Sequence, residues 1–163
     1  MARLRLPRQA AAAGAAASAV ETVDIGFLES LLGYNARRAA LAVIEVFLVR
    51  MAPYGLKPVD FSVMSLITHN PGITSRQLCH TLGILPPNLV GMVNALERRE
   101  LIERRPHPRD GRAMGLHLTP SGQELMREAE RTAAALEADV AGGLTAAELR
   151  TLIGLLKKVY RRD

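Results

Sequence analysis

The helical spacing of apolar residues in this chain is interrupted between residues 101 and 119 by a segment that alternates. Residues 114–118 alternate apolar side chains with small or polar ones, and the run 102–105 is also typical of a strand. Between these runs lies PHPRDGRA, whose prolines, glycine and charges favour an exposed loop. We therefore predict one β-hairpin in a chain whose other patterns are helical.

Two short helices are predicted directly before this hairpin. Thr74 and Gln77 form a capping box, in which each side chain can satisfy a backbone amide of the other residue. The helix that follows ends at Gly83, and Pro86 is placed as the first residue of the next helix. Two short helices joined by a tight turn form a helix-turn-helix, and a hairpin directly behind it is a wing.

Longer helical patterns flank this region on both sides. Residues 25–52 form one long helical pattern with apolar residues on more than one face, which indicates burial on more than one face. Thr119 and Pro120 begin a second pattern, and Thr145 and Glu148 form a capping box that begins a third. For a small domain, a partner subunit is an economical cover for the additional apolar faces, so we expect a homodimer.

The composition agrees with a mainly helical fold. Of the 163 residues, 48% are hydrophobic but only 4% are aromatic, so the core must consist of Ala, Leu, Val, Ile and Met, many of which favour helices. The predicted fold class is mainly α with a small β-hairpin wing, a winged helix-turn-helix with a helical dimerisation region. The expected parts are a disordered basic tail at 1–22, a dimerisation helix within 23–56, a winged helix-turn-helix lobe at 57–119 and C-terminal dimerisation helices at 120–163.

The net charge of +5 favours a polyanionic partner. The basic start of the chain is followed by alanines without a Leu or Val cluster, so we interpret it as a tail rather than a secretory leader. Since no apolar run approaches about 20 residues, we expect a cytoplasmic protein that has no membrane partner.

The densest basic cluster ends the second short helix and continues through the hairpin. It consists of Arg98, Arg99, Arg104, Arg105, Arg109 and Arg112. Arginines on a projecting loop suit phosphates and the negative potential of a narrow minor groove. Asp110 is close enough in sequence to pair with Arg112 and fix its direction. An ordinary solvated charge run is the alternative, but its coincidence with a wing favours DNA binding.

The stretch from Gly83 through Thr119 resembles the multiple antibiotic resistance regulator (MarR) family of winged helix-turn-helix proteins. The resemblance rests on LVGMVNALERRELIERR and on PRDGRAMGLHLTPSG, whose DxR…LT…G pattern is its most specific part. The segments LGYNARRAAL and GLKPVDFSVMSLI also resemble the first two helices of the family. The resemblance covers residues from about 27 to 160.

This resemblance implies a transcriptional regulator, with a repressor as the family default. The helix at 85–100 would enter the major groove, and the wing would place Arg112 in the minor groove with Asp110 as its orienting partner. The helices at 27–52, 120–142 and 145–161 would interlock with a second subunit, so the operator should be near-palindromic. The residues nearest the bases would be Pro86, Pro87, Asn88, Gly91 and Asn94.

The recognition helix departs from the family pattern. Leu85 stands where the family often has a capping Ser, and Gly91 stands where an Arg is common. Asn88 and Asn94 are the polar base readers that remain on that face. Gly91 could let DNA approach the backbone closely, or could have a structural reason.

Members of the family commonly bind a small anionic or aromatic effector between the dimerisation helices and the DNA-binding lobe. Arg37 and Arg38 could meet a carboxylate or the phosphates of an acyl-CoA thioester, or could instead form surface or inter-subunit ion pairs. The residues that could face such a cavity are Tyr34, Arg37, Arg38, Met64 and His69.

Other functions receive less support from the residues. Cys79, the single cysteine, is interpreted as a small buried hydrophobe, although a thiol redox sensor stays open as an alternative. The four histidines lack the spacing of a metal site, and no enzyme motif or cofactor loop is present, so we expect neither metal, cofactor nor catalysis. A winged helix that binds proteins rather than specific DNA is the second alternative.

Overall fold

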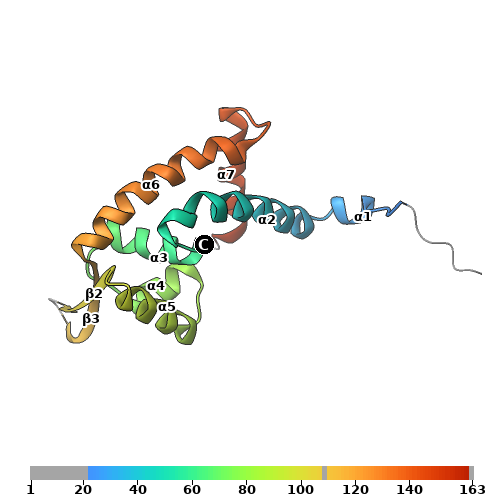
Figure 1. The fold of residues 1–163 in the computed structure, drawn as a ribbon. Helices are drawn as coiled ribbons and strands as arrows, with labels where there is room; N and C mark the ends of the chain where they lie inside the picture. The colour runs from blue at the N-terminus through green and yellow to red at the C-terminus, as the bar shows by residue number, and fades with distance from the viewer. Residues whose placement is uncertain (1–21, 108–109, 162–163) are drawn as a thin grey trace, which may run out of the picture. The chain divides into compact units, whose positions relative to one another are not determined.

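The computed structural model describes residues 22–107 and 110–161, apart from the side chains of residues 107, 110–112, 137 and 138 (Figure 1). The chain has two compact units, residues 1–35 and residues 36–163. The predicted basic tail lies outside the described residues, except for Thr22.

The N-terminal helical pattern is broken, whereas the sequence predicted one helix over 25–52. Helix α1 spans Gly26–Glu29, and α2 spans Leu32–Met51. At the break, the Ser30 hydroxyl donates to the carbonyl oxygen of Phe27 at 2.7 Å, and the Asn35 amide donates to that of Glu29 at 2.7 Å. These side-chain bonds satisfy carbonyl groups that a continuous helix would have used, so the expectation of one helix was wrong.

The predicted helix-turn-helix is confirmed. It follows the short helix η1 (Ala52–Tyr54) and α3 (Pro58–His69), and consists of α4 (Ser75–Leu82) and α5 (Pro86–Arg98). The capping box forms, because the Thr74 N–H donates to Gln77 Oε1 at 2.9 Å and the Gln77 N–H donates to Thr74 Oγ1 at 3.3 Å. Gly83 ends α4 with a φ of 64°, a backbone conformation that glycine adopts readily.

The predicted hairpin is part of a three-stranded antiparallel sheet. Strands β2 (Ile102–His107) and β3 (Asp110–Leu118) are longer than the sequence predicted, and they pair with Ile102 opposite Leu118. Strand β1 (Ile73–Thr74) pairs with the other edge of β3, so the order is β1-β3-β2. A two-residue strand is too short to show any period in the sequence.

The core lies where α3, α4, α5 and the hairpin meet helix α6 (Pro120–Ala141), and Figure 1 shows the first three helices gathered beside β2 and β3. It is aromatic-poor, as the composition predicted. Its least exposed large side chains are Met51, Met64, Ile67, Leu78, Leu89, Leu96, Leu116 and Met126. Helix α7 (Ala146–Tyr160) contributes no buried residue to it. Of the helices that the structure describes, none is by itself long and apolar enough to cross a membrane.

Candidate nucleic-acid interface

Helix α5 has one buried face and one exposed face. Leu89, Val93 and Leu96 pack into the core, each with about 1% of its surface exposed. A residue recurs on the same side of a helix after three, four or seven positions, so Pro87, Gly91, Asn94 and Arg98 share the opposite face. Pro86, Pro87, Asn88 and Gly91 are exposed, and Asn94 is half-buried. All five predicted base readers therefore lie on one short helix with an outward face.

The first turn of α5 has no side-chain cap. Leu85 occupies the capping position and makes no side-chain hydrogen bond to the helix, as its apolar side chain requires. The next two residues are prolines, which have no N–H group to cap and fix φ in the helical range. The helix therefore begins at this position without the serine that is common in the resembling family.

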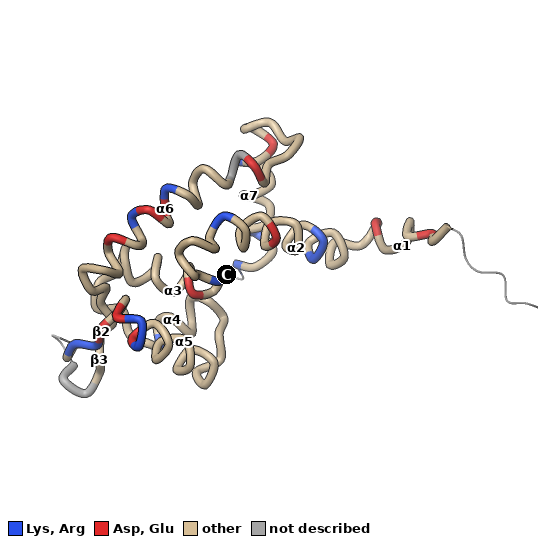
Figure 2. Tube along the Cα trace, viewed as in Figure 1, with Lys and Arg blue, Asp and Glu red and all other residues tan. Residues whose placement is uncertain are grey.

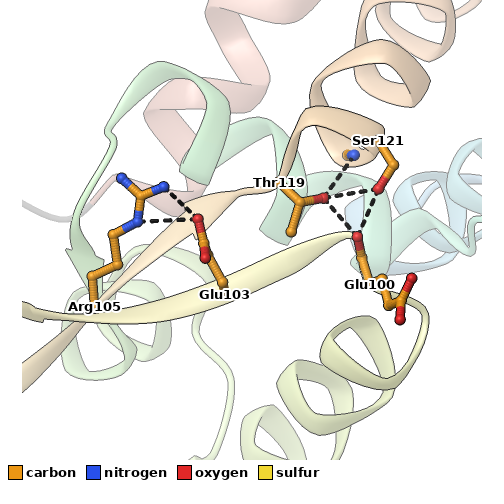
Figure 3. Close-up of polar contacts among 6 residues, drawn as sticks. Glu100, Glu103, Arg105, Thr119 and Ser121 are labelled. Carbon is orange, nitrogen blue, oxygen red and sulfur yellow. Dashed lines mark hydrogen bonds and ion pairs between the residues drawn. The ribbon is translucent and has the colours of Figure 1, made fainter.

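Figure 2 shows the positions of Lys and Arg in blue, and the basic residues around α5 and β2 differ in what they contact. Arg98 is exposed in the last turn of α5. Arg104 Nη2 donates to Asn94 Oδ1 at 2.7 Å and lies 3.2 Å from Glu97 Oε2. Arg105 forms an ion pair with Glu103, and its Nε lies 3.0 Å from Glu103 Oε1 (Figure 3). Arg98 and Arg105 are thus exposed at the surface, whereas Arg104 is held against the helix.

Arg99 belongs to the basic cluster in sequence but makes internal contacts. Its guanidinium donates to the carbonyl oxygens of Gly55 at 2.9 Å and Tyr54 at 2.8 Å. The Tyr54 hydroxyl in turn lies 2.8 Å from Thr132 Oγ1 on α6. Arg99 therefore connects the end of the recognition helix to η1, a role that sequence reasoning missed because the partners are more than 40 residues away.

The tip of the hairpin carries the remaining predicted wing residues. Arg109 lies outside the described residues. Asp110 and Arg112 lie in β3, but their side chains also fall outside the described part of the chain. The pairing of Asp110 with Arg112 and the minor-groove contact of Arg112 consequently remain predictions.

The base of the wing is fixed by a group of hydrogen bonds (Figure 3). The hydroxyls of Thr119 and Ser121 both donate to the carbonyl oxygen of Glu100, at 2.6 and 2.7 Å. Glu100 has a φ of 57°, in the left-handed region that residues with a side chain rarely adopt. Gly122, in the first turn of α6, has no room for a side chain, because a Cβ there would lie 2.0 Å from the carbonyl oxygen of Leu101. The LTPSG segment thus joins α5, β2 and α6.

The predicted effector residues lie on α2 and α3, and they differ in exposure. On α2, Tyr34 is half-buried, and Arg37 and Arg38 are exposed. Met64 is fully buried in the core, where it has no surface to offer a ligand. His69 Nε2 lies 3.0 Å from Glu130 Oε1 on α6, and the Ser65 hydroxyl donates to the same oxygen at 3.1 Å.

Two cavities lie among the described residues of the lobe, and neither is lined by a predicted effector residue. One, of about 560 Å³, lies beside the end of α3 and α4 and includes Asn70, Ile73 and Gln77. The other, of about 450 Å³, includes Thr68, Arg105 and His117.

Cys79 is half-buried and packs against the core, whereas the sequence predicted a buried side chain.

Helices α2 and α7 expose a large share of their apolar side chains. In α7, these residues recur on one side of the helix, where they are 38–66% exposed. They are Leu152, Ile153, Leu155, Leu156, Val159 and Tyr160. In α2, Leu41, Val43, Ile44, Leu48 and Val49 are likewise exposed. Contiguous apolar surface of this kind is typical of a protein–protein contact.

Known proteins resemble this chain over most of its length. Residues 54–113 match the MarR family. The chain is 32% identical over 139 residues to a Thauera aromatica protein described as a transcriptional regulator for the hcr operon, a match that covers 85% of this chain and 84% of that protein.

Two solved structures of the transcriptional repressor CouR are also similar. CouR bound to a 23-mer DNA duplex has a TM-score of 0.81 and 38% identity, over 86% of this chain and 99% of that one. CouR bound to p-coumaroyl-CoA has a TM-score of 0.79 and 36% identity, over 87% of this chain and 100% of that one.

Proposed function

This chain belongs to the MarR family of DNA-binding transcriptional regulators, and on that premise we propose that it is a homodimeric repressor released from DNA by an aromatic acyl-CoA thioester. It is a regulator and not an enzyme. The observation that carries the proposal is the outward face of α5, which lies beside a basic hairpin in a chain whose overall fold is similar to that of a DNA-bound repressor.

We infer that α5 enters the major groove and that the hairpin contacts the adjacent minor groove. The residues of α5 that would lie nearest the bases are Pro86, Pro87, Asn88, Gly91 and Asn94, with the two prolines offering apolar contact to thymine methyl groups. Arg98 and Arg105 would contact phosphates, and Arg112 would enter the minor groove.

A second copy of the chain is the proposed cover for the apolar surfaces of α2 and α7. Burial of these apolar side chains is favourable relative to leaving them in water. A symmetric dimer would bury them, because its interface uses the same patch on both subunits. Two α5 helices would then face half-sites about one DNA turn apart, so the operator would be near-palindromic.

The proposed effector is an aromatic acid carried as its CoA thioester. The support comes from CouR, which is similar to this chain both on DNA and with p-coumaroyl-CoA. Arg37 and Arg38 are exposed on α2 and could bind the phosphates of CoA. The ligand would shift the dimer toward an arrangement in which the spacing of the two α5 helices no longer matches that of the half-sites. The affinity for DNA would therefore fall.

A mobility-shift assay on the DNA upstream of the protein's own gene tests this proposal. We expect a salt-sensitive, specific complex that p-coumaroyl-CoA dissociates, whereas free CoA and p-coumarate, each added alone, do so less effectively. If a specific complex forms but no CoA thioester dissociates it, the proposed effector is wrong and the proposed repressor function stands.

A protein-interaction module is the second candidate, because α5 and the residue that precedes it expose apolar side chains. Leu85 is 69% exposed and Val90 is 53% exposed, and both would suit a protein partner. Binding to all DNA sequences with equal affinity, with no specific complex at modest salt, would favour this candidate.

A further inference from the structure

The two asparagines on the outer face of α5 differ in their hydrogen bonding. Asn94 Oδ1 accepts a hydrogen bond of 2.7 Å from Arg104 of β2. The side chain of Asn88 makes no hydrogen bond to any residue that the structure describes, so both its donor and its acceptor are available.

The contact with Arg104 fixes which way the Asn94 amide points. A guanidinium group carries only donors, so only the carbonyl oxygen of the amide can face it. The amide nitrogen with its two hydrogens therefore points away from Arg104, and within the described ranges no residue accepts a hydrogen bond from it.

Arg104 is itself held in place. The same Nη2 atom lies 3.2 Å from the Glu97 carboxylate, and the two side chains are 38% and 31% exposed. A guanidinium with a carboxylate and a carbonyl partner is less available to a DNA phosphate than an unpaired one. Arg104, Glu97 and Asn94 thus form one group at the junction of α5 and β2, which we call the Asn94 clamp.

This geometry changes what Asn94 can read in a major groove. A free asparagine recognises adenine with two hydrogen bonds, because its oxygen accepts from N6 and its nitrogen donates to N7. In the Asn94 clamp the oxygen is turned toward Arg104, from which it already accepts a hydrogen bond, so the two amide hydrogens are the groups left to meet a base. Guanine offers two adjacent acceptors, O6 and N7, whereas cytosine offers only a donor.

We propose that Asn94 is a donor-only base reader that selects guanine, and that Arg104 is the positioning residue that sets this preference. The inference rests on the proposed DNA-binding function. Arg104 acts through Asn94 and does not serve as a phosphate contact. Asn88, with both groups available, reads adenine in the ordinary way.

The test is selection of binding sites from a duplex library with randomised half-sites, carried out with the full-length protein and its variants. The wild type should select guanine at one position in each half-site. Asn94→Ala should lose that preference alone, which corresponds to a loss of about 5- to 150-fold in discrimination at that base.

Arg104→Met is the decisive variant, because it keeps an apolar stem of similar length and removes every donor. It should shift the preference at the same position from guanine toward adenine, since the amide is then free to turn. Arg105→Met is the matched control: Arg105 pairs with Glu103 instead of Asn94, so its loss should lower affinity for all sequences without changing the selected base.

A modified base provides a second readout. Replacement of the selected guanine by 7-deazaguanine removes the N7 acceptor, and this should weaken the wild type but not Asn94→Ala. An unchanged preference in Arg104→Met, in the presence of specific wild-type binding, overturns the donor-only assignment and leaves the proposed function intact. Absence of any sequence preference in the wild type overturns both.

Discussion

At the scale of single residues, two helical glycines have opposite surroundings. Gly91 on α5 has no heavy atom within 4 Å of the place that a Cβ would occupy, whereas at Gly122 on α6 the Leu101 carbonyl oxygen is 2.0 Å away. Because the space beside Gly91 is open, packing does not explain why a glycine, which weakens a helix, stands there. At Gly122 packing does explain the glycine, because a larger residue would collide with the Leu101 carbonyl oxygen.

Gly91→Ala should stabilise the fold and weaken DNA binding. Alanine is favoured over glycine inside a helix by about 1 kcal/mol, so the free energy of unfolding in urea should rise by about that amount. The added methyl would occupy the space where we propose that DNA approaches the backbone, so affinity for the operator should fall. Equal or higher affinity would show that DNA does not approach α5 at this residue.

Gly122→Ala should destabilise the lobe. The new methyl cannot fit beside the Leu101 carbonyl, and the resulting backbone shift should lower the free energy of unfolding by about 1–3 kcal/mol. Urea denaturation measures the change, and Gly143→Ala is a control, because nothing lies within 4 Å of its Cβ position. Equal stabilities for the wild type and Gly122→Ala would contradict the close packing of α6 on the hairpin.

At the scale of elements, the start of α7 depends on a charged cap. The N–H and the hydroxyl of Thr145 each donate to Glu148 Oε2 at 2.8 Å. These two hydrogen bonds hold the pKa of Glu148 below its usual value of 4.5. The charged form is therefore the one that the folded helix favours.

Acid should weaken this cap. Because the folded pKa is lowered, the stabilisation is present above about pH 4.5 and is lost as the pH falls through the lower folded value. We expect the thermal midpoint to decrease below that pH. In Glu148→Gln the amide oxygen still accepts and does not titrate, so this part of the decrease should be absent. If the thermal midpoint decreases equally in the wild type and in Glu148→Gln, titrating groups other than Glu148 cause the decrease.

Elements with local signals were predictable from the sequence. The Thr74 and Thr145 caps, Gly83 and Pro86 each act within a few residues of themselves, and they placed α4, α5 and the start of α7. The break at Ser30 was missed, because the apolar spacing continues through it. The contacts of Arg99 with η1 and of Arg104 with Asn94 join distant segments, so a basic residue of the cluster could not be assigned to DNA or to the fold from sequence alone.

At the scale of the whole molecule, we propose that the exposed apolar side of α7 is an interface between two copies. Leu156→Asp would place a charge within that surface, and burial of an unpaired charge is costly. We expect a monomer in sedimentation velocity and a large loss of operator affinity, because a single α5 contacts only one half-site. Gly154→Asp, on the opposite side of α7, adds the same charge where nothing lies within 4 Å of the Cβ position, and it should remain a dimer. Dimers of both variants would place the interface elsewhere.

The wing and the dimer should contribute separately to DNA binding. Arg112→Ala should lower operator affinity by roughly 1–3 kcal/mol while the protein remains dimeric. Asp110→Ala should have a smaller effect, and none in the Arg112→Ala background if Asp110 acts by orienting Arg112. Mobility shifts with the single and double variants measure this coupling. Unchanged affinity in Arg112→Ala would remove the hairpin from the DNA interface.

The most direct test of the account is a footprint of the wild-type protein on the DNA upstream of its own gene. We predict protection of two symmetric half-sites with centres about one helical turn, roughly 10 base pairs, apart. Addition of p-coumaroyl-CoA should remove the protection. A footprint confined to one half-site, or no sequence-specific protection at modest salt, would contradict a dimeric repressor that reads DNA with two copies of α5.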